Sequence, residues 1–226
     1  QAYTRKADIL EAAHAHFQDI LQTPEKDREV FGYLAERGYL LADMYAMELG
    51  AYKDRQALQE ELKSKGYTEQ EIRESGLLTA GFGEDYKLTL LWRDAAGRAI
   101  GIVGRAIMPE EELKAKGLSK YKYSAGLKKD AGLIGFSSVR GSEQIVLLEG
   151  VLDALYLNFK GFKSVAVGGT SLSTSQLQML EAVGTKELLL ALDMDEPGQR
   201  ATEKILRELA GSSLRAYVVS LPEGYK

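Results

Sequence analysis

Apolar residues recur at helical spacing through the first third of the chain. Over residues 3–23 they fall at every third or fourth position, which predicts an amphipathic helix that Thr23-Pro24 ends. Thr68-Glu-Gln-Glu71 has the sequence of a capping box and predicts the start of a later helix. The same periodicity predicts further helices at 25–37, 41–48 and 54–65. The N-terminal part is therefore expected to be mainly helical.

The pattern changes near residue 87. The apolar run Lys87–Trp92 and the glycine-containing run 98–107 predict two strands, and Asp94-Ala-Ala-Gly97 between them predicts the turn of a hairpin. The segment 109–132 is basic and shows no clear period, so it is expected to be mostly loop with one helical turn near Glu111.

From Gln144 onward, short apolar runs alternate with amphipathic segments. Strands are predicted at 145–148, 163–167, 187–192 and 215–220, with helices at 150–160, 173–183 and 197–210. This alternation is typical of a mostly parallel sheet covered by helices. We expect an α/β fold (α+β over the whole chain), with an N-terminal subdomain at 1–142 and an α/β lobe at 143–226.

Composition narrows the classes of protein that fit. The chain has 226 residues, 45% hydrophobic and 27% charged, which is ordinary for a globular protein. No run is long and apolar enough to span a bilayer and no signal peptide is visible, so we expect a cytoplasmic protein without a membrane partner. Because there is no cysteine, disulfides and cysteine-ligated zinc sites are excluded from this segment.

The net charge of −4 does not favour nucleic-acid binding by the molecule as a whole, but the charge is unevenly distributed. Residues 97–140 contain nine Lys and Arg against four acids. A basic segment beside clustered carboxylates is what an enzyme that handles a polyanion would need, although a solvated lysine-rich loop has the same composition.

Carboxylates follow two of the predicted strands. Glu149 and Asp153 come after the strand at 145–148, and Asp193 and Asp195 come after the strand at 187–192. Ligand-binding groups gather at the carboxyl ends of parallel strands, and carboxylate oxygens are the preferred ligands of Mg²⁺. A magnesium-dependent reaction on phosphates is therefore the leading interpretation.

Purely structural roles are the alternative interpretation of these acidic residues. Glu149 would interact favourably with the N-terminus of the next helix. With Pro197 as the first helical residue, Glu196 would be the N-cap, so the aspartates before it would have no capping role. The glycine pair in Gly168-Gly169-Thr170 allows close approach of a phosphate, or forms an ordinary turn.

The motifs Glu149-Gly150-x-x-Asp153, Gly169-Thr170 and Asp193-x-Asp195-x-x-Gly198 resemble the Toprim domain of topoisomerases, primases and nucleases. Upstream motifs narrow the resemblance to the RNA polymerase core of DnaG-type bacterial primases, as a divergent member. They include Tyr33-Leu-x-x-Arg37-Gly38, Gly97-Arg98-x-Ile-Gly101-x-x-Gly104-Arg105 and Lys120-Tyr121-x-x-Ser124, and Leu221-Pro-Glu-Gly224 resembles the lead-in to a further motif.

The resemblance implies DNA-templated synthesis of RNA primers by a nucleotidyltransferase. Glu149, Asp193 and Asp195 would be catalytic and bind Mg²⁺ or Mn²⁺ with support from Asp153, and Glu149 would be either a ligand or a base. Template and nucleotide would be held by Lys87, Arg98, Arg105, Lys120, Tyr121, Lys122, Lys128, Lys129, Gly150, Gly169 and Thr170. The implied partners are single-stranded DNA, nucleoside triphosphates and, through regions outside this chain, a replicative helicase.

Lys87, Trp92 and Tyr123 depart from the family pattern, which is compatible with bacterial, phage or mobile-element replication. Two alternatives stay open: a Toprim nuclease that uses the same carboxylates, and a non-catalytic DNA-binding scaffold. Gln1 and the end at Lys226 suggest a fragment of a longer protein. The resemblance implies a zinc-binding domain before it and a helicase or helicase-binding domain after it.

Overall fold

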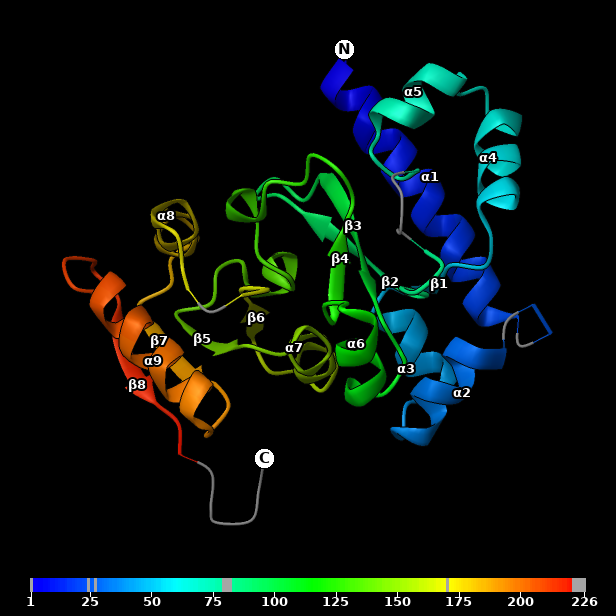
Figure 1. Ribbon diagram of the computed structural model, residues 1–226. Coiled ribbons are helices and arrows are strands. Elements are labelled where there is room, and N and C mark those ends of the chain that lie inside the picture. Colours follow the sequence, from blue (N-terminus) through cyan, green and yellow to red (C-terminus); the bar gives the residue numbers. More distant parts are fainter. Residues whose placement is uncertain (1, 24, 27, 79–82, 170, 221–226) are drawn as a thin grey trace. The chain divides into compact units, whose positions relative to one another are not determined.

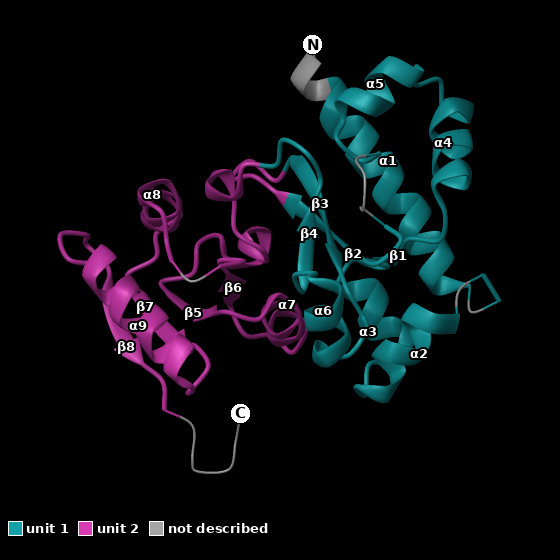
Figure 2. Cartoon of the chain, in the orientation of Figure 1, with its two compact units in different colours: residues 1–92, 98–127 teal, residues 93–97, 128–226 magenta. Residues whose placement is uncertain are grey.

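A computed structural model describes residues 2–23, 25–26, 28–78, 83–169 and 171–220 (Figure 1). The chain forms two compact units (Figure 2). Unit 1 comprises residues 1–92 and 98–127, and unit 2 comprises residues 93–97 and 128–226. The expected functional division at 142/143 stays a prediction. No helix in the described part of the chain is long and apolar enough to cross a membrane.

Unit 1 combines helices with a four-stranded sheet in the order β1-β2-β3-β4. Its helices are α1 (Ala2–Gln22), α2 (Arg28–Glu36), α3 (Leu41–Ala46), α4 (Arg55–Ser64), α5 (Glu69–Glu74) and α6 (Glu110–Lys116). Its strands are β1 (Leu49–Ala51), β2 (Leu88–Arg93), β3 (Ala99–Arg105) and β4 (Tyr121–Tyr123). The β1–β2 and β3–β4 pairs are antiparallel.

Helix α1 packs on this sheet through the apolar stripe seen in the sequence. Its Ile9, Leu10 and Phe17 are buried in one cluster with residues of α4, α5 and β3. The approach is closest at Gly50, where an added Cβ would lie 2.6 Å from Cβ of Phe17. A glycine at this position of β1 therefore allows the helix to lie against the strand.

The predicted capping box of α5 is present and ties α5 to α1. The Thr68 hydroxyl accepts a hydrogen bond from the Glu71 backbone N–H, and the Glu71 carboxylate accepts from the Thr68 backbone N–H. The Arg5 guanidinium also donates to that carboxylate, over 2.8 Å. These hydrogen bonds lower the pKa of Glu71 to about 2, and the one from Arg5 has the largest effect.

Unit 2 is the predicted α/β lobe. Strands β5 (Gln144–Leu148), β6 (Ser164–Ala166), β7 (Glu187–Ala191) and β8 (Arg215–Val218) form a parallel sheet in the order β6-β5-β7-β8. Helices α7 (Val151–Phe159), α8 (Thr174–Ala182) and α9 (Glu196–Glu208) connect them, and two short 3₁₀ helices, η1 (Lys129–Ala131) and η2 (Phe136–Val139), precede β5. The parallel sheet confirms the predicted fold class.

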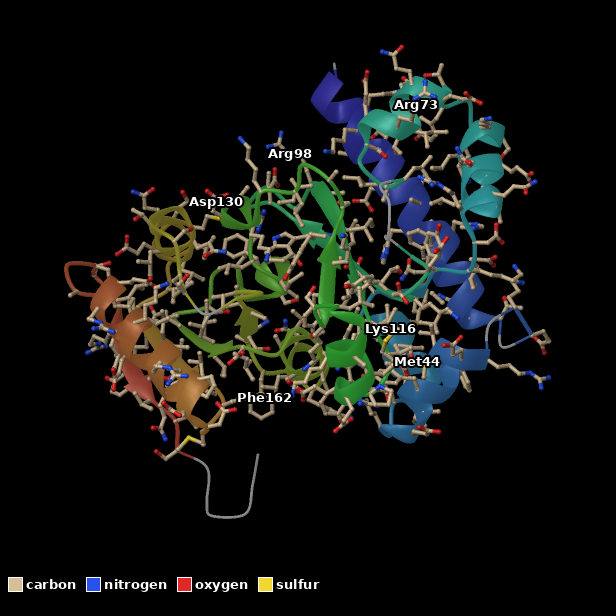
Figure 3. The ribbon with its side chains drawn as sticks, viewed as in Figure 1. Met44, Arg73, Arg98, Lys116, Asp130 and Phe162 are labelled. Carbon is tan, nitrogen blue, oxygen red and sulfur yellow. The ribbon has the colours of Figure 1, made fainter. Side chains whose placement is uncertain are left out.

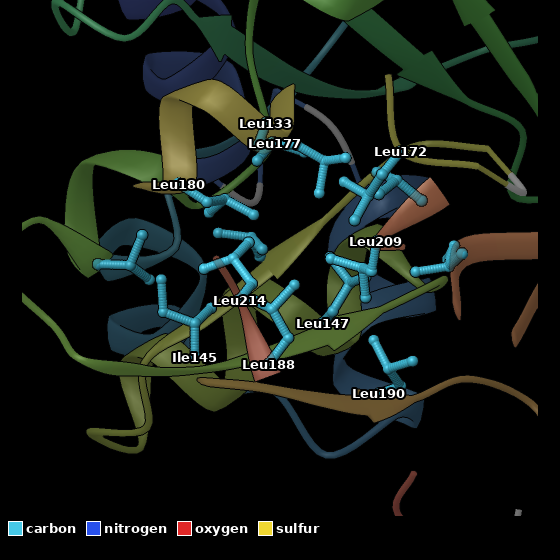
Figure 4. Packing of buried hydrophobic residues seen from close by; sticks show 14 of the residues in the cluster. Leu133, Ile145, Leu147, Leu172, Leu177, Leu180, Leu188, Leu190, Leu209 and Leu214 are labelled. Atoms are coloured by element: carbon cyan, nitrogen blue, oxygen red, sulfur yellow. The ribbon is translucent and has the colours of Figure 1, made fainter. Parts of the chain in front are cut away.

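Alternate residues of the central strands build the core of unit 2. Ile145 and Leu147 of β5 and Leu188 and Leu190 of β7 are fully buried in one cluster (Figure 4). Leu177 and Leu180 of α8 and Ala201 and Ile205 of α9 complete the cluster on that face. Helix α7 packs against β5 and β6. Because side chains alternate between the two faces of a strand, the buried residues of β5 and β7 all lie on the face covered by α8 and α9.

The prediction for 109–132 was only partly right: the helix expected near Glu111 is present, but it is longer than one turn, and a strand was missed. Helix α6 spans seven residues and β4 pairs with β3 in this segment. Lys114 and Lys116 form ion pairs with Glu110 and Glu112 four residues earlier, which supports a helix with little apolar surface. Strand β4 alternates lysine and tyrosine, a period of two that the high charge of the segment concealed.

Candidate metal and nucleotide site

The parallel register brings three predicted motifs to one edge of the sheet in unit 2. Leu148 at the end of β5 lies opposite Ala191 of β7 and Ala166 of β6. Glu149 follows β5 directly, Asp193 lies two residues beyond β7, and Gly168 two residues beyond β6. Neighbouring strands are separated by about 4.8 Å. The three connecting segments therefore leave adjacent strands at the same carboxyl edge.

Asp195 has a structural role that the sequence interpretation excluded. Helix α9 begins at Glu196, Pro197 is its second residue, and Asp195 is the N-cap. Its Oδ1 accepts a hydrogen bond from the backbone N–H of Gly198 over 2.9 Å. The expectation that Glu196 caps this helix was wrong, because proline is also tolerated within the first turn, where its missing N–H is not needed.

Gly198 in the same motif is required by crowding. It is buried, and a Cβ added to it would lie 2.0 Å from the backbone oxygen of Asp193. Ordinary contacts begin near 3.4 Å, so any larger residue would push the first turn of α9 and the Asp193 backbone apart. The Asp-x-Asp-x-x-Gly motif thus forms a compact turn. It is held by the hydrogen bond from Gly198 to Asp195 and by the close packing of Gly198 on the Asp193 backbone.

The residues of the Glu-Gly-x-x-Asp motif also have local structural roles. Gly150 is the N-cap of α7, and Asp153 lies in the first turn of that helix. An added Cβ at Gly150 would lie 1.9 Å from Oδ2 of Asp153, so the carboxylate folds back over the glycine. A negative charge in the first turn interacts favourably with the positive end of the helix. Asp153 therefore stabilises the start of α7 close to Glu149.

The four acids differ in exposure. Asp153, Asp193 and Asp195 are exposed, whereas Glu149 is half-buried. In the described part of the chain no three acids or histidines lie close enough together to hold a metal ion. The donors nevertheless fit a hard divalent cation, because carboxylates are suitable ligands and all four lie at one edge of the sheet. Binding an ion would require side chains among these four acids to turn toward the capped Asp195.

The predicted nucleotide-binding residues are divided between the units. In unit 1, Arg98 and Lys120 are exposed, and Arg98 lies just before β3 (Figure 3). Lys122 and Tyr121 lie in β4, opposite Gly104 and Arg105 of β3. Unit 2 contributes the exposed Lys128 and Lys129, together with Gly150 and Gly169, while Thr170 lies outside the described residues. Desolvation lowers the pKa of Lys129.

Arg105 lies deeper than the prediction implied. Its side chain is only 8% exposed, and its Nη1 donates to the Tyr33 hydroxyl. Its guanidinium also lies 5.2 Å from the ring centroid of Tyr33 and 5.9 Å from that of Tyr121. The role of Arg105 in nucleotide binding stays a prediction, and a phosphate would meet it through this aromatic environment.

Lys87 is paired with an acid that the sequence did not single out. Its Nζ donates to the carboxylate of Glu29 in α2. Both residues line a cleft of about 610 Å³ in unit 1, together with Tyr33 and residues of α6. Glu29 lies 58 positions from Lys87, and Tyr33 lies 72 positions from Arg105. No local sequence signal could have identified these partners, because both pairs depend on tertiary packing.

Two of the residues that depart from the family pattern contact each other. The rings of Trp92 and Tyr123 are 5.9 Å apart in an edge-to-face arrangement. Trp92 is fully buried, and burial raises the pKa of the half-buried Tyr123 hydroxyl. The departures at positions 92 and 123 therefore form one packing unit between β2 and β4.

The chain is similar to known proteins in sequence and in fold. Residues 146–226 match the family described as Toprim-like. The DNA primase of Deinococcus radiodurans is 31% identical, over 92% of this chain and 37% of that protein. The chain thus spans little more than a third of this relative.

Solved structures share the fold over nearly the whole chain. The Aquifex aeolicus primase, comprising zinc-binding and RNA polymerase domains, superimposes with a TM-score of 0.81 at 25% identity. The match covers 100% of this chain and 57% of that one. The RNA polymerase domain of Mycobacterium tuberculosis primase DnaG, solved in complex with double-stranded DNA, gives 0.79 at 25% identity, with 98% and 74% covered.

Proposed function

We propose that this chain, which belongs with the RNA polymerase cores of DnaG-type bacterial primases, synthesises RNA primers on a single-stranded DNA template. The observation that carries the proposal is the parallel register of β6, β5 and β7. It places the glycine turn, Glu149 and the Asp193–Asp195 turn at one carboxyl edge, in the lobe that matches the Toprim-like family. In this reaction a primer 3′-hydroxyl attacks the α-phosphate of a nucleoside triphosphate and releases pyrophosphate.

Glu149, Asp193 and Asp195 would hold Mg²⁺ or Mn²⁺, with Asp153 in support. When bound, such an ion stabilises negative charge on the attacking and leaving oxygens. The chain's own contribution is to position the carboxylates: the Gly198 N–H orients Asp195, and the close packing at Gly198 places Asp193. The half-buried Glu149 would act as a further ligand or as the base that accepts the proton of the 3′-hydroxyl.

The nucleic acid and the triphosphate would be bound by the basic residues. Exposed Arg98, Lys120, Lys128 and Lys129 are suited to phosphate contacts, which make binding fall steeply with salt. Lys87 would first have to exchange its Glu29 partner for a phosphate. A replicative helicase would be contacted through regions outside this chain, and the reaction would take place in the cytoplasm.

The test is extension of a short RNA annealed to a DNA template, with labelled nucleoside triphosphates and Mg²⁺ or Mn²⁺. A preformed primer removes the need for initiation. Asp193→Asn is the test variant, and Glu203→Gln, an exposed acid in α9 of the same unit, is the matched control. Elongation by the wild type and the control, together with loss in Asp193→Asn, would support the proposal.

Other outcomes would favour the alternatives. Strand scission without triphosphates, abolished by Asp193→Asn, would indicate a nuclease. Binding of the template without elongation or scission by any variant would indicate a scaffold. Elongation that Asp193→Asn leaves unchanged would refute the assignment of the carboxylates.

A further inference from the structure

Exposed aromatic rings and lysines gather at the end of α7, away from the carboxylates. We name Tyr156, Phe159, Lys160, Phe162 and Lys163 the α7 patch. Phe159 is 38% exposed and Phe162 is 57% exposed. The Lys160 ammonium lies 5.0 Å from the ring centroid of Tyr156 and 4.9 Å from that of Phe159. Because α7 begins beside Glu149 and runs back along the sheet, the patch lies at the opposite edge.

The backbone holds this patch in a defined position. After α7 ends, Gly161 adopts φ +90°, its N–H donates to Asn158 O, and the Phe162 N–H donates to Leu157 O over 2.9 Å. This is a Schellman motif. The Asn158 side chain also donates to Ser164 O and accepts from Ser164 N–H. Phe162 is therefore presented on a fixed turn at the surface of the unit (Figure 3).

The residue after such a turn usually packs its apolar side chain on the preceding helical turn. Phe162 instead leaves more than half of its surface exposed. An exposed phenylalanine on a rigid turn, three residues after a second exposed ring, is a preformed apolar platform. Packing of the turn alone does not explain it.

The charge around the platform is positive. From Ala154 to Leu180 the chain has no acid, and its only charged residues are Lys160 and Lys163. Among the described residues, no carboxylate forms an ion pair with either lysine. Two acids at the same edge, Glu143 and Glu187, are paired with Lys186 and Arg215. This acid-free segment stands out in a chain whose net charge is −4.

We propose that the α7 patch is a second binding surface for single-stranded nucleic acid, in which bases stack on Phe159 and Phe162 while Lys160 and Lys163 contact phosphates. The Lys163 ammonium also donates to the Ser138 backbone oxygen over 3.0 Å, which leaves two of its three N–H groups for a phosphate. Aromatic side chains beside cations are the composition that binds single strands without sequence preference. Lysine is depleted in the cores of protein–protein interfaces, so a protein partner is less favoured.

The position suits a strand that also reaches the carboxylates. The nine residues of α7 span about 13 Å at about 1.5 Å per residue. At the duplex rise of about 3.4 Å per nucleotide this corresponds to about four nucleotides, and an extended single strand would need fewer. A strand held at the carboxylate edge would meet the patch a few nucleotides away. The proposal rests on the proposed function only in taking a nucleic acid as the ligand.

The test measures binding of fluorescently labelled dT12 and rU12 to the whole chain by anisotropy. We expect Phe162→Ala to weaken binding about 5- to 150-fold, as for loss of one stacked base. Phe162→Tyr, which keeps a ring, should bind like the wild type. Tyr217→Ala removes a 47% exposed ring from β8 in the same unit and should have no effect.

A second variant tests the cation. Lys160→Gln should reduce the slope of log affinity against log salt by about 1, and Lys204→Gln on α9 should leave it unchanged. If the substitutions weaken dT12 binding more than rU12 binding, the DNA strand is the ligand. If they weaken rU12 binding more, the RNA product is the ligand. Because the readout is binding, it stands apart from failure of primer extension.

The proposal would be overturned if Phe162→Ala and Lys160→Gln bound both oligonucleotides like the wild type. It would also be overturned if Phe162→Ala changed only the sedimentation of the chain, which would identify a contact with a second copy. Circular dichroism of each variant shows whether the fold is kept. If Phe162→Ala did not fold, the salt slope of Lys160→Gln would decide.

Discussion

Gly198→Ala is the substitution that most directly tests the account of the Asp-x-Asp turn. A methyl group at this position would lie 2.0 Å from the Asp193 oxygen and 2.7 Å from its carbonyl carbon. Both atoms belong to the backbone, so no side-chain rotation can relieve the clash. Reaching an ordinary contact of 3.4 Å would require a relative displacement of about 1.4 Å between the start of α9 and Asp193.

Two effects on stability oppose each other. Alanine in place of glycine in a helix stabilises by about 0.5–1 kcal/mol, whereas overpacking costs about 1–3 kcal/mol. The net expectation is a loss of up to about 2.5 kcal/mol in the free energy of unfolding, which lowers Tm by up to about 10 °C for a chain of this size. Misplacing a reacting group by about 1 Å reduces activity about 100-fold. We therefore expect activity to fall much further than stability.

Gly32→Ala is the matched control. Gly32 lies in α2, and an added Cβ there would have no atom within 4 Å. It should raise Tm by about 1–4 °C, because only the helical preference for alanine applies. Calorimetry and primer extension would be measured for both variants. If Gly198→Ala raised Tm as Gly32→Ala does and kept wild-type extension, the argument from crowding would be refuted.

Three further predictions concern single carboxylates. Asp195→Ala should lower the free energy of unfolding, measured by chemical denaturation, by about 1 kcal/mol, whereas Asp195→Asn and Asp193→Asn should change it little. All three substitutions should abolish primer extension. The pKa of Glu71 is lowered to about 2 in the folded state, so its stabilising effect is complete above pH 4.5 and is lost as the pH falls toward 2. In Glu71→Gln, the free energy of unfolding should therefore depend less on pH between these values, as measured by acid unfolding followed by tryptophan fluorescence. Glu29→Gln should tighten single-stranded DNA binding about 1.5- to 5-fold by releasing Lys87, and unchanged anisotropy would argue against a role for this lysine.

The sequence predicted the elements whose signal is local. The 3.6-residue period marked α1 and α4, and the capping box at Thr68 marked the start of α5. It missed β1 and β4, which are three residues long and take their strand geometry from pairing with β2 and β3. Three residues are too few to separate a period of two from chance, and the alternation of lysine and tyrosine in β4 lies in a highly charged segment.

In the candidate site, too, the sequence predicted the features with a local signal and missed those that depend on tertiary packing. The edge of the sheet that carries Glu149 and Asp193 followed from the alternation of strands and helices, because the register of parallel strands is set by their buried faces. The N-cap role of Asp195 was missed because it depends on where the helix starts within one residue. The Glu29 and Tyr33 contacts depend on packing between distant segments.

The capping role of Asp195 strengthens the case for its chemical role. A carboxylate has two oxygens with about four lone-pair sites, and the Gly198 N–H occupies one of them. The remaining sites stay available at the exposed carboxylate, while the capping bond restricts its rotamers before any ligand arrives. Part of the entropy cost of ordering a ligand side chain is therefore met by folding. On this reasoning, Asp195 is held in place by the start of α9, whereas the position of Asp193 depends on the close approach of its backbone to Gly198.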